Sequence, residues 1–307
     1  MADKSHNQTD KLLEQMEKRI SAIYAEAQVD MKKKAEAYFD AFIAEGDRKL
    51  KLVKAGKLSE AEYQKWVKNK IAYGKRFDQF KRQYAEAMSH VNEIAAAYIN
   101  DQLPDIYALN YNGAGEDIAS QVGGYSFTMA DASTVKNLAT RDTTLLPYKY
   151  IDGKKDVRWN TQKVNAAITQ GILQGESIPN IAKRLSKNIP EMNKASAIRN
   201  ARTATTGAEC AGRQSQYEDA TRRGIQLQRE WIAAIDMRTR HAHRLLDGQL
   251  ADVDKPFESE LGDIMFPGDP EAHPANVYNC RCTVAAKVMG FNKVEVENKE
   301  IKEDEKK

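Results

Sequence analysis

Cysteine and histidine residues near the C-terminus have the types and the spacing of a metal site. Cys280 and Cys282 are two positions apart, so on an extended segment both thiolates point to the same face and can reach one ion. Zn²⁺ accepts sulfur and imidazole ligands in a tetrahedral arrangement. Only one of His241 and His243 can join the cysteines, because side chains two positions apart on a helix are separated by about 200° around the axis.

This metal prediction has a structural alternative. The spacing differs from the familiar paired C-x-x-C arrangement, and small buried thiols beside a structural histidine would give the same pattern. The chain holds three cysteines in total, which is a poor basis for a disulfide framework and suits a reducing compartment. We therefore predict zinc in a structural rather than a catalytic site, with His273 or an acidic residue of the segment 252–271 completing the shell.

The residues around the proposed ligands indicate the elements that position them. Residues 227–235 mix apolar and β-favouring types, which is typical of a strand. Asp236 follows at the position of a helix N-cap, where its carboxylate would accept a hydrogen bond from a backbone N–H two or three positions later. Gly248 lies where a left-handed residue would end that helix. Arg238 and Arg240 would face different sides of it, one toward an acidic partner and the other toward solvent, a subunit or phosphate.

An ordered set of residues in this region points to a family. Its members are Trp231, Asp236, Arg238, Arg240, His243 and Gly248, followed by Asn279, Cys280, Arg281 and Cys282. The set resembles the C-terminal domain of the phage Mu protein F-like minor head proteins, also called phage head morphogenesis proteins, over about residues 160–287. The family pattern selects His243 as the third metal ligand. The chain departs from the pattern at Ala204, where members often carry glutamate.

The resemblance implies a structural component of a virion rather than an enzyme. The implied protein is a minor capsid protein, present in few copies inside the head near the portal, which acts in head assembly, DNA packaging or DNA ejection. Its implied partners are the portal protein and the major capsid or scaffold protein. It would occur in the host cytoplasm during assembly and in the virion afterwards.

Composition sets limits that agree with this expectation. A chain of 307 residues can form two domains, and a charged fraction of 30% with a mean hydropathy of −0.67 predicts a soluble, helix-rich protein. The sequence lacks the run of about 18 apolar residues that a membrane-spanning helix needs. Its N-terminus lacks the apolar core of a secretory signal. A membrane role is therefore disfavoured.

Helical periodicity dominates the N-terminal third. Apolar residues recur every three or four positions in two stripes, the first comprising Leu12, Met16, Ile20, Ile23, Ala27 and Met31, and the second running from Tyr63 to Tyr98. We predict that residues 1–102 form a hairpin of two long helices joined near residues 55–60. Ser59 is the predicted N-cap of the second helix, and Gly74 marks a break within it.

The rest of the chain divides by periodicity and composition. Residues 103–157 are predicted to be an irregular connector with one short helix near residues 134–140, because periodicity fails and glycines recur there. Residues 158–226 are predicted to be helical, with Ser177 capping a helix that runs through Ser186 and another helix from Met192 to Gly224. Residues 227–290 are predicted to form the α+β domain that carries the family residues. Residues 291–307 are a predicted disordered, charged tail. The fold class is therefore mainly α with a small C-terminal α+β domain.

A basic segment suggests two alternatives, contact with nucleic acid or a solvated helix face. Residues 48–82 carry a local net charge of +9, whereas the whole chain carries +3. Basic and aromatic residues interleave there, which would suit non-specific contact with the phosphates of double-stranded DNA. The candidate DNA-binding residues are Lys49, Lys51, Lys54, Lys57, Lys65, Lys68, Lys70, Lys75, Arg76, Lys81 and Arg82. The alternative is a lysine-rich helix face that only contacts water.

Two other classes of function are considered. A metal-dependent nuclease or hydrolase would use His243 and the Cys280/Cys282 site, with Asp236 as a further ligand, but it needs an open coordination position and a convergent acid or base. A secreted effector that carries this domain as a delivery module is set aside, because about 25 residues follow Cys282.

Overall fold

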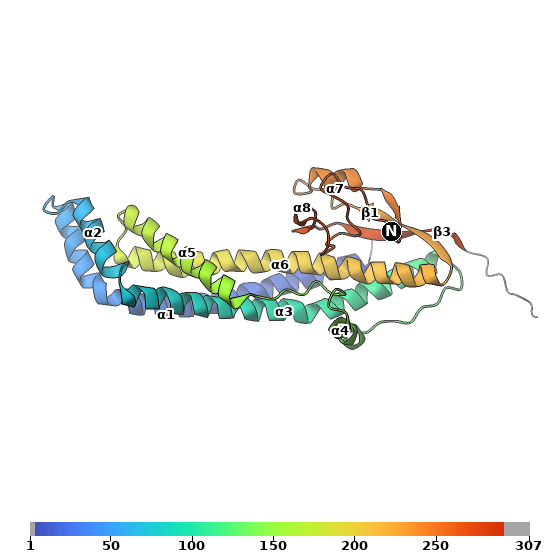
Figure 1. Ribbon diagram of the computed structural model, residues 1–307, viewed down its shortest axis with the longest axis horizontal. Helices are drawn as coiled ribbons and strands as arrows, with labels where there is room; N and C mark the ends of the chain where they lie inside the picture. Colours follow the sequence, from blue (N-terminus) through green and yellow to red (C-terminus); the bar gives the residue numbers. More distant parts are fainter. Residues whose placement is uncertain (1–3, 292–307) are drawn as a thin grey trace, which may run out of the picture. The chain divides into compact units, whose positions relative to one another are not determined.

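The fold is mainly helical with one small antiparallel sheet, and the predicted fold class is confirmed. The structure is a computed structural model that describes residues 4–291 (Figure 1). Its elements are α1 (Lys4–Lys54), α2 (Glu60–Ile71), α3 (Lys75–Gln121), α4 (Ala132–Arg141), α5 (Gly153–Leu173), α6 (Ile178–Arg222), β1 (Ile225–Ile232), α7 (His241–Leu246), β2 (Leu250–Asp252), α8 (Pro274–Val277) and β3 (Thr283–Phe291). Within the described residues, no helix has the length and apolarity needed to cross a bilayer.

The chain is divided into two compact units. Among the described residues, unit 1 comprises Asn7–Ile106 and Leu146–Thr205, and unit 2 comprises residues 4–6, Tyr107–Leu145 and residues 206–291. Helices α1, α3 and α6 each contribute residues to both units. The predicted tail lies outside the described residues except for Phe291, which ends strand β3.

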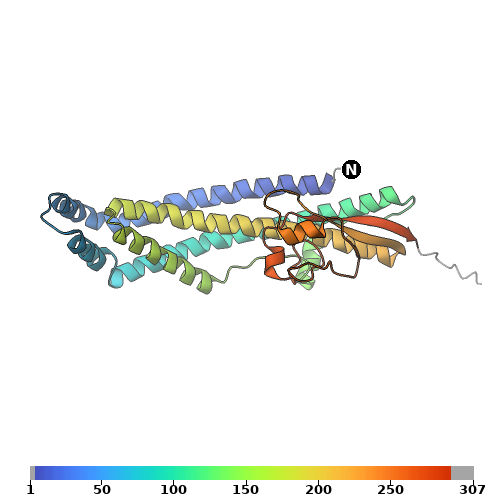
Figure 2. The same cartoon turned by 90° about the horizontal axis from the view of Figure 1, so that it is seen from above.

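Unit 1 is a bundle in which long stretches of α1, α3 and α6 run side by side with α5 (Figure 2). The apolar stripes predicted from the sequence lie inside it. Buried members are Met16, Ile20, Ala27 and Met31 on α1, and Phe77, Phe80, Tyr84 and Met88 on α3. Aromatic rings join the two helices, since Tyr38 stacks on Phe80 with 4.2 Å between ring centroids. Burial of these stripes supplies the main driving force for the bundle.

A network of polar side chains crosses the apolar core of unit 1. The hydroxyl of Tyr24 donates to Oδ1 of Asn92 at 2.6 Å. Asn92 Nδ2 donates in turn to Oδ1 of Asn193 at 2.7 Å and to Oδ2 of Asp156 at 2.9 Å. Asn193 Nδ2 donates to Oδ1 of Asn160 at 2.9 Å. The network therefore links α1, α3, α5 and α6, and its members satisfy one another inside the bundle.

The predicted N-terminal hairpin is in fact built from three helices. The long helix α1 ends at Lys54, and Gly74, at φ +90°, separates α2 from α3. The break predicted at Gly74 is confirmed, because glycine adopts a positive φ without the clash that a Cβ would cause.

The predicted irregular connector 103–157 is wrong over its first part, because α3 continues through Pro104 to Gln121. Buried residues on both sides of the proline, Leu103 and Ile106, hold the helix despite the missing hydrogen bond. Gly113 and Gly115 are helical rather than turn residues. A Cβ at either position would lie 2.6 Å from a side-chain atom of Ser5 or Phe127, so these glycines allow close packing.

The other helix boundaries also shift. Helix α4 covers the predicted residues 134–140, whereas α5 begins at Gly153, earlier than predicted. Helix α6 begins after Ser177, the predicted cap, whose Oγ accepts from the N–H of Asn180 at 3.4 Å. It then runs unbroken through Pro190, where the sequence predicted two helices. The buried residues Ile189 and Asn193 flank this proline.

Ser59 caps α2 as predicted, and removing its hydroxyl tests the cap. Ser59 Oγ accepts from the N–H of Glu62 at 3.2 Å, and Glu62 Oε2 accepts from the N–H of Ser59 at 2.9 Å. We expect Ser59→Ala to destabilise the first turn of α2 by about 1 kcal/mol, measured as faster amide hydrogen exchange there. Lys65→Ala, in the same helix but outside the cap, is the control. Equal exchange rates in both variants would contradict the assignment.

Unit 2 contains a three-stranded sheet in the order β2-β1-β3, with antiparallel pairs. The predicted strand 227–235 is β1, which begins and ends earlier, at Ile225 and Ile232. Its alternating burial places Leu227 and Trp231 in the core with residues of α3 and α6. This core holds the central strand β1 in place, and the chain continues from the end of β1 to the proposed metal ligand His243.

Side chains from the helices of unit 2 cover the outer edge of β3. The carbonyl of Val284 accepts from Arg213 Nη1 at 3.1 Å and from the Tyr217 hydroxyl at 3.3 Å. Gln121 donates to the carbonyl of Ala286 and accepts from the N–H of Val288, both at 3.3 Å. These contacts replace the strand partner that an edge lacks.

Candidate metal centre

The structure brings the three predicted metal ligands together. His243 lies on α7, and Cys280 and Cys282 lie on the extended segment that precedes β3, rather than on the strand itself. Their ligand atoms all lie within 4.8 Å of one another, and His243 Nδ1 is 3.5 Å from each Sγ. Tetrahedral zinc, with Zn–S of about 2.3 Å and Zn–N of about 2.1 Å, would separate nitrogen and sulfur by about 3.6 Å. The arrangement therefore fits the ion that the sequence predicted.

The surrounding core fixes the imidazole ring. Trp231, at the end of β1, packs edge-on against His243 with 5.4 Å between ring centroids and 73° between ring planes. Phe257 also packs edge-on against Trp231, with 5.2 Å between ring centroids and 76° between ring planes. Asn279 has φ +56°, a left-handed conformation that asparagine tolerates better than most residues, and it turns the chain toward Cys280. The fold thus positions both halves of the site.

Asn276 determines which nitrogen of His243 faces the cysteines. Its Nδ2 donates to the carbonyl of Gly262 at 2.7 Å, so its Oδ1 must point toward the histidine. That Oδ1 lies 3.2 Å from His243 Nε2 and also accepts from the Ser259 hydroxyl at 3.1 Å. Nε2 therefore carries the proton, and the lone pair of Nδ1 points at the thiols. Outer hydrogen bonds of this kind orient histidine ligands in metal sites.

The two thiols differ in acidity. A hydrogen bond from Cys280 lowers the pKa of Cys282 to about 5, with a further hydrogen bond from the backbone N–H of Ala234, although burial opposes the shift. The pKa of Cys280 is raised, first by its hydrogen bond with Cys282 and then by burial. Cys282 is therefore the more acidic thiol of the pair. A metal bound through both sulfurs requires both as thiolates, so binding releases protons.

The predicted fourth ligands do not join the site. His273 is exposed, and its Nδ1 accepts from the N–H of Ala275 at 3.3 Å at the start of α8. Asp269 is buried, but its carboxylate accepts from the backbone N–H groups of Met265 at 3.1 Å and Glu271 at 2.9 Å. In the stretch from residue 4 to residue 291, no fourth His, Cys, Asp or Glu side chain joins the three ligands.

Asp236 has a different role from the predicted helix cap. Its carboxylate forms a double ion pair with Arg281, at 2.6 and 2.8 Å, which holds the pKa of Asp236 well below its usual range. It also accepts from the N–H of Arg238 at 2.8 Å, as predicted. The prediction of a helix beginning at Asp236 was wrong. Residues 236–239 form a separate turn, closed by a hydrogen bond from the N–H of Asp236 to Thr239 Oγ1, and α7 begins only at His241.

Arginines fasten the turn 236–239 next to the cysteine segment. Arg240 donates to the carbonyl of Tyr278, and Arg244 donates to the carbonyl of Asp236 at 2.8 Å. The predicted placement of Arg238 and Arg240 on two sides of a helix was wrong, since both precede α7. Gly248 has φ +76° directly after the cap of α7, so its predicted left-handed conformation is confirmed.

Sequence reasoning missed a buried arginine that holds the loop after β2. Arg229, on β1, is fully buried and donates to Gln214 Oε1 at 3.0 Å and to the carbonyl of Asp252 at 2.8 Å. It also donates to the carbonyls of Lys255 and Met265. Burial lowers the pKa of Arg229 to about 10, which leaves it charged at neutral pH. An arginine within a strand gives no sequence signal for this role.

The predicted DNA-binding residues lie on and between α1, α2 and α3 in unit 1. Those with exposed side chains are Lys51, Lys54, Lys57, Lys65, Lys68, Lys70, Lys75, Arg76 and Arg82, whereas Lys49 and Lys81 are half-buried. Lys49 lies over the ring of Trp66 at 5.4 Å, and Lys81 pairs with Asp78 at 2.9 Å. The exposed group thus offers positive charge to solvent.

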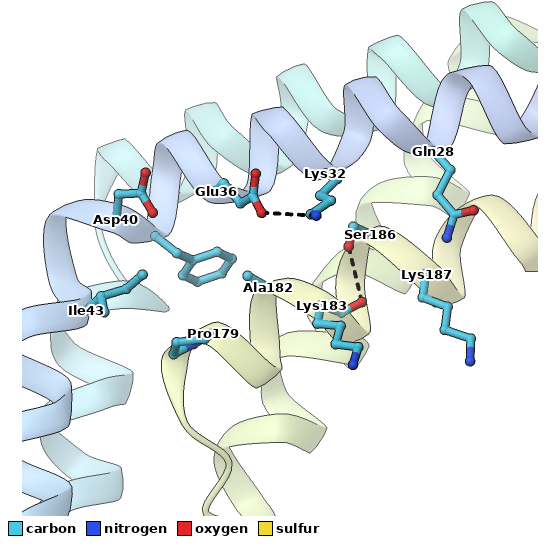
Figure 3. A pocket seen from close by; sticks show the side chains of 11 residues that line it. Gln28, Lys32, Glu36, Asp40, Ile43, Pro179, Ala182, Lys183, Ser186 and Lys187 are labelled. Atoms are coloured by element: carbon cyan, nitrogen blue, oxygen red, sulfur yellow. Dashed lines mark hydrogen bonds and ion pairs between the residues drawn. The ribbon is translucent and has the colours of Figure 1, made fainter.

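Unit 1 also contains a groove between α1 and α6 (Figure 3). Its volume is about 610 Å³, and apolar side chains such as Phe39 and Ile43 line it. At its edge Lys32 pairs with Glu36 at 3.7 Å. Charges of both signs line the groove, and its side chains do not converge on a point as the His-Cys-Cys group does.

Comparison with known proteins supports the resemblance. Residues 162–285 match the family described as Phage Mu protein F like protein. The matched segment includes every family residue from Trp231 to Cys282, so the resemblance is confirmed over this segment.

Two known proteins are similar to different lengths of the chain. The chain is similar to the minor head protein GP7 of Bacillus phage SPP1, with 27% identity over 289 residues that cover 92% of this chain and 85% of that protein. It is also similar to the NAD(+)--arginine ADP-ribosyltransferase EFV of Enterococcus faecalis, with 33% identity over 163 residues. That match covers 51% of this chain and 31% of the transferase. No solved structure matches the chain.

Proposed function

We propose that the protein is a non-enzymatic minor component of the phage head that acts inside the head, near the portal, in assembly and in DNA packaging or ejection. The observation that carries this proposal is the similarity to a minor head protein over 92% of the chain, which includes residues of both units. The portal protein and the major capsid or scaffold protein are the proposed partners. The protein would pass through the host cytoplasm during assembly.

We further propose that zinc bound by His243, Cys280 and Cys282 stabilises unit 2. The three residues are 1–2% exposed, so the site has little access for a substrate. Two thiolates and a neutral imidazole would balance the charge of Zn²⁺, which suits an apolar surrounding because an uncompensated buried charge is costly. Burial and charge balance together favour a structural ion.

The alternative function is a metal-dependent nuclease or hydrolase at the same three residues. Such an enzyme needs a convergent acid or base, and Asp236 is instead paired with Arg281. The match to the ADP-ribosyltransferase covers less than a third of that enzyme and carries no proposal of activity for this chain. Cleavage of plasmid DNA that requires a divalent metal and is abolished by His243→Ala would favour the alternative.

Quantitative mass spectrometry of purified particles and procapsids tests the proposed function. We expect a few copies of this chain per particle, counted against the major capsid protein. Presence in procapsids alone would instead indicate a transient assembly factor. Absence from both would overturn the proposal.

We also expect the basic segment to bind double-stranded DNA without sequence preference. Replacing Lys65, Lys68 and Lys70 of α2 by glutamate should weaken binding at least tenfold. The slope of log affinity against log salt should fall by about 3, because each phosphate contact releases roughly 0.9 counterions. Fluorescence anisotropy with duplexes of unrelated sequence at several salt concentrations measures both effects.

The control for this experiment reverses the same number of charges elsewhere in unit 1. Lys154, Lys183 and Lys187 are exposed lysines of α5 and α6, outside the basic segment. Their replacement by glutamate should leave the salt slope nearly unchanged. Wild-type affinity that does not respond to salt would exclude phosphate contact.

A further inference from the structure

The two ends of strand β1 in unit 2 carry surfaces of opposite charge. Just beyond its C-terminal end lies a surface that we call the knob, formed by Ile235, Met237, Arg238 and Tyr278. Around its N-terminal end lies a groove of about 670 Å³, which includes Ile225, Leu227, Asp252, Val253 and Asp254. The chemistry of the two surfaces is complementary.

The knob exposes large apolar side chains on a fixed turn. Met237 is 97% exposed, Ile235 66% and Tyr278 58%. Arg240 joins this turn to the carbonyl of Tyr278, and the Asp236–Arg281 ion pair fastens it further. Exposed apolar clusters mark interaction sites. A turn held in one conformation binds with little loss of conformational entropy.

The knob also carries positive charge. Arg238 lies within the turn and Arg244 lies on α7 beside it, and both side chains are exposed. The charge of Arg281 is offset by Asp236. The apolar tip is thus accompanied by a net positive charge.

The groove offers the complementary features. Its floor contains the buried apolar residues Ile225, Leu227 and Val253. Exposed carboxylates of Glu218, Asp252 and Asp254 line its rim. The rim also carries Arg222, which pairs with Asp219, and Lys255 lies 3.7 Å from Asp254. The buried Arg229 also interacts electrostatically with Glu218, Asp252 and Asp254. Three carboxylates against Lys255 and Arg229 leave the groove with a small net negative charge.

We infer that the knob of one copy of this chain docks into the groove of a second copy, with Met237 on the apolar floor and Arg238 facing Asp252 and Asp254. The groove reaches no further along β1 than Gln228, and four residue steps, about 13 Å at roughly 3.3 Å per residue, separate it from the end of the strand at Ile232, beyond which the knob begins. A chain therefore does not fill its own groove. Each copy uses its knob toward one neighbour and its groove toward the other. Such a heterologous contact builds rings or open chains rather than two-fold dimers.

Complementary variants of the full chain test this contact. The knob variant is Met237→Asp with Arg238→Glu, and the groove variant is Asp252→Lys with Asp254→Lys. Sedimentation velocity and native mass spectrometry, from low to several hundred micromolar protein, should show growing oligomers for the wild type. Each variant alone should remain monomeric, with association weakened at least tenfold.

Mixing the two variants in equal amounts gives the decisive result. The knob variant keeps its groove and the groove variant keeps its knob, so the mixture should form dimers and nothing larger. Met129→Asp removes a methionine that is 65% exposed elsewhere in unit 2 and should leave wild-type association unchanged. A monomeric wild type at the highest concentration would overturn the inference. A mixture without dimers, from variants that melt like the wild type, would also overturn it.

Discussion

Replacing Cys282 by serine will remove the zinc that we propose for this site and lower the melting temperature of unit 2 by roughly 10 °C or more. The expected loss is larger than about 4 kcal/mol, which is what a ligand contributes when its free concentration is a thousandfold above its Kd. Serine cannot supply the thiolate that binds the ion together with His243 and Cys280. Elemental analysis should find one zinc per wild-type chain and none in the variant, and calorimetry measures the melting temperature.

Cys210 provides the matched control. It is also a buried cysteine of unit 2, but it is not one of the three converging ligands. Cys210→Ala should retain the zinc and lose about 1 kcal/mol or less, because only a small side chain is removed. If metal-free wild-type protein melts at the same temperature as the zinc-loaded protein, the site has no role in stability.

Replacing Arg229 by methionine will destabilise unit 2 by about 3–5 kcal/mol, as expected when a buried charged group that donates several hydrogen bonds is removed. The change leaves the carbonyls of Asp252, Lys255 and Met265 without their donor inside the fold. An unsatisfied buried acceptor costs about 1–3 kcal/mol. Urea unfolding measures the difference in the free energy of unfolding.

An exposed arginine serves as the comparison for this substitution. Arg223 is exposed and donates to one carbonyl, that of Ser126, at 2.8 Å. Arg223→Met should therefore change the free energy of unfolding by less than about 0.5 kcal/mol. Similar losses in the two variants would show that burial of Arg229 is not what stabilises the loop.

The helices of unit 1 were predictable because local sequence decides them. Apolar periodicity placed Met16 and Tyr84 in the core, and Ser59 was predicted as the N-cap of α2, where the structure adds a capping box with Glu62. The glycines at 113 and 115 were misread as turns, because the sequence does not show that Ser5 and Phe127 pack against them. Whether a glycine ends a helix or lies within one depends on such distant neighbours.

The candidate site was predictable in its ligands but not in its supports. The spacing of Cys280 and Cys282 restricts both thiols to one region, and the family residues selected His243. Asn276 could not be found in the same way, since its role depends on hydrogen bonds to Gly262 and His243 made by the folded loop. Asp236 was placed in a helix because the sequence cannot show that Arg281, distant in the chain, takes its carboxylate.

The polar network inside unit 1 has a mechanical consequence. Apolar stripes alone would let long parallel helices slide by one turn, about 5.4 Å, and still bury similar surfaces. Such a slip would break the bonds from Asn92 to Asn193 and Asp156 together and leave buried amides without partners. The network therefore opposes sliding of the helices past one another. A force applied along the bundle at one end is transmitted to the other end without a change in helix register.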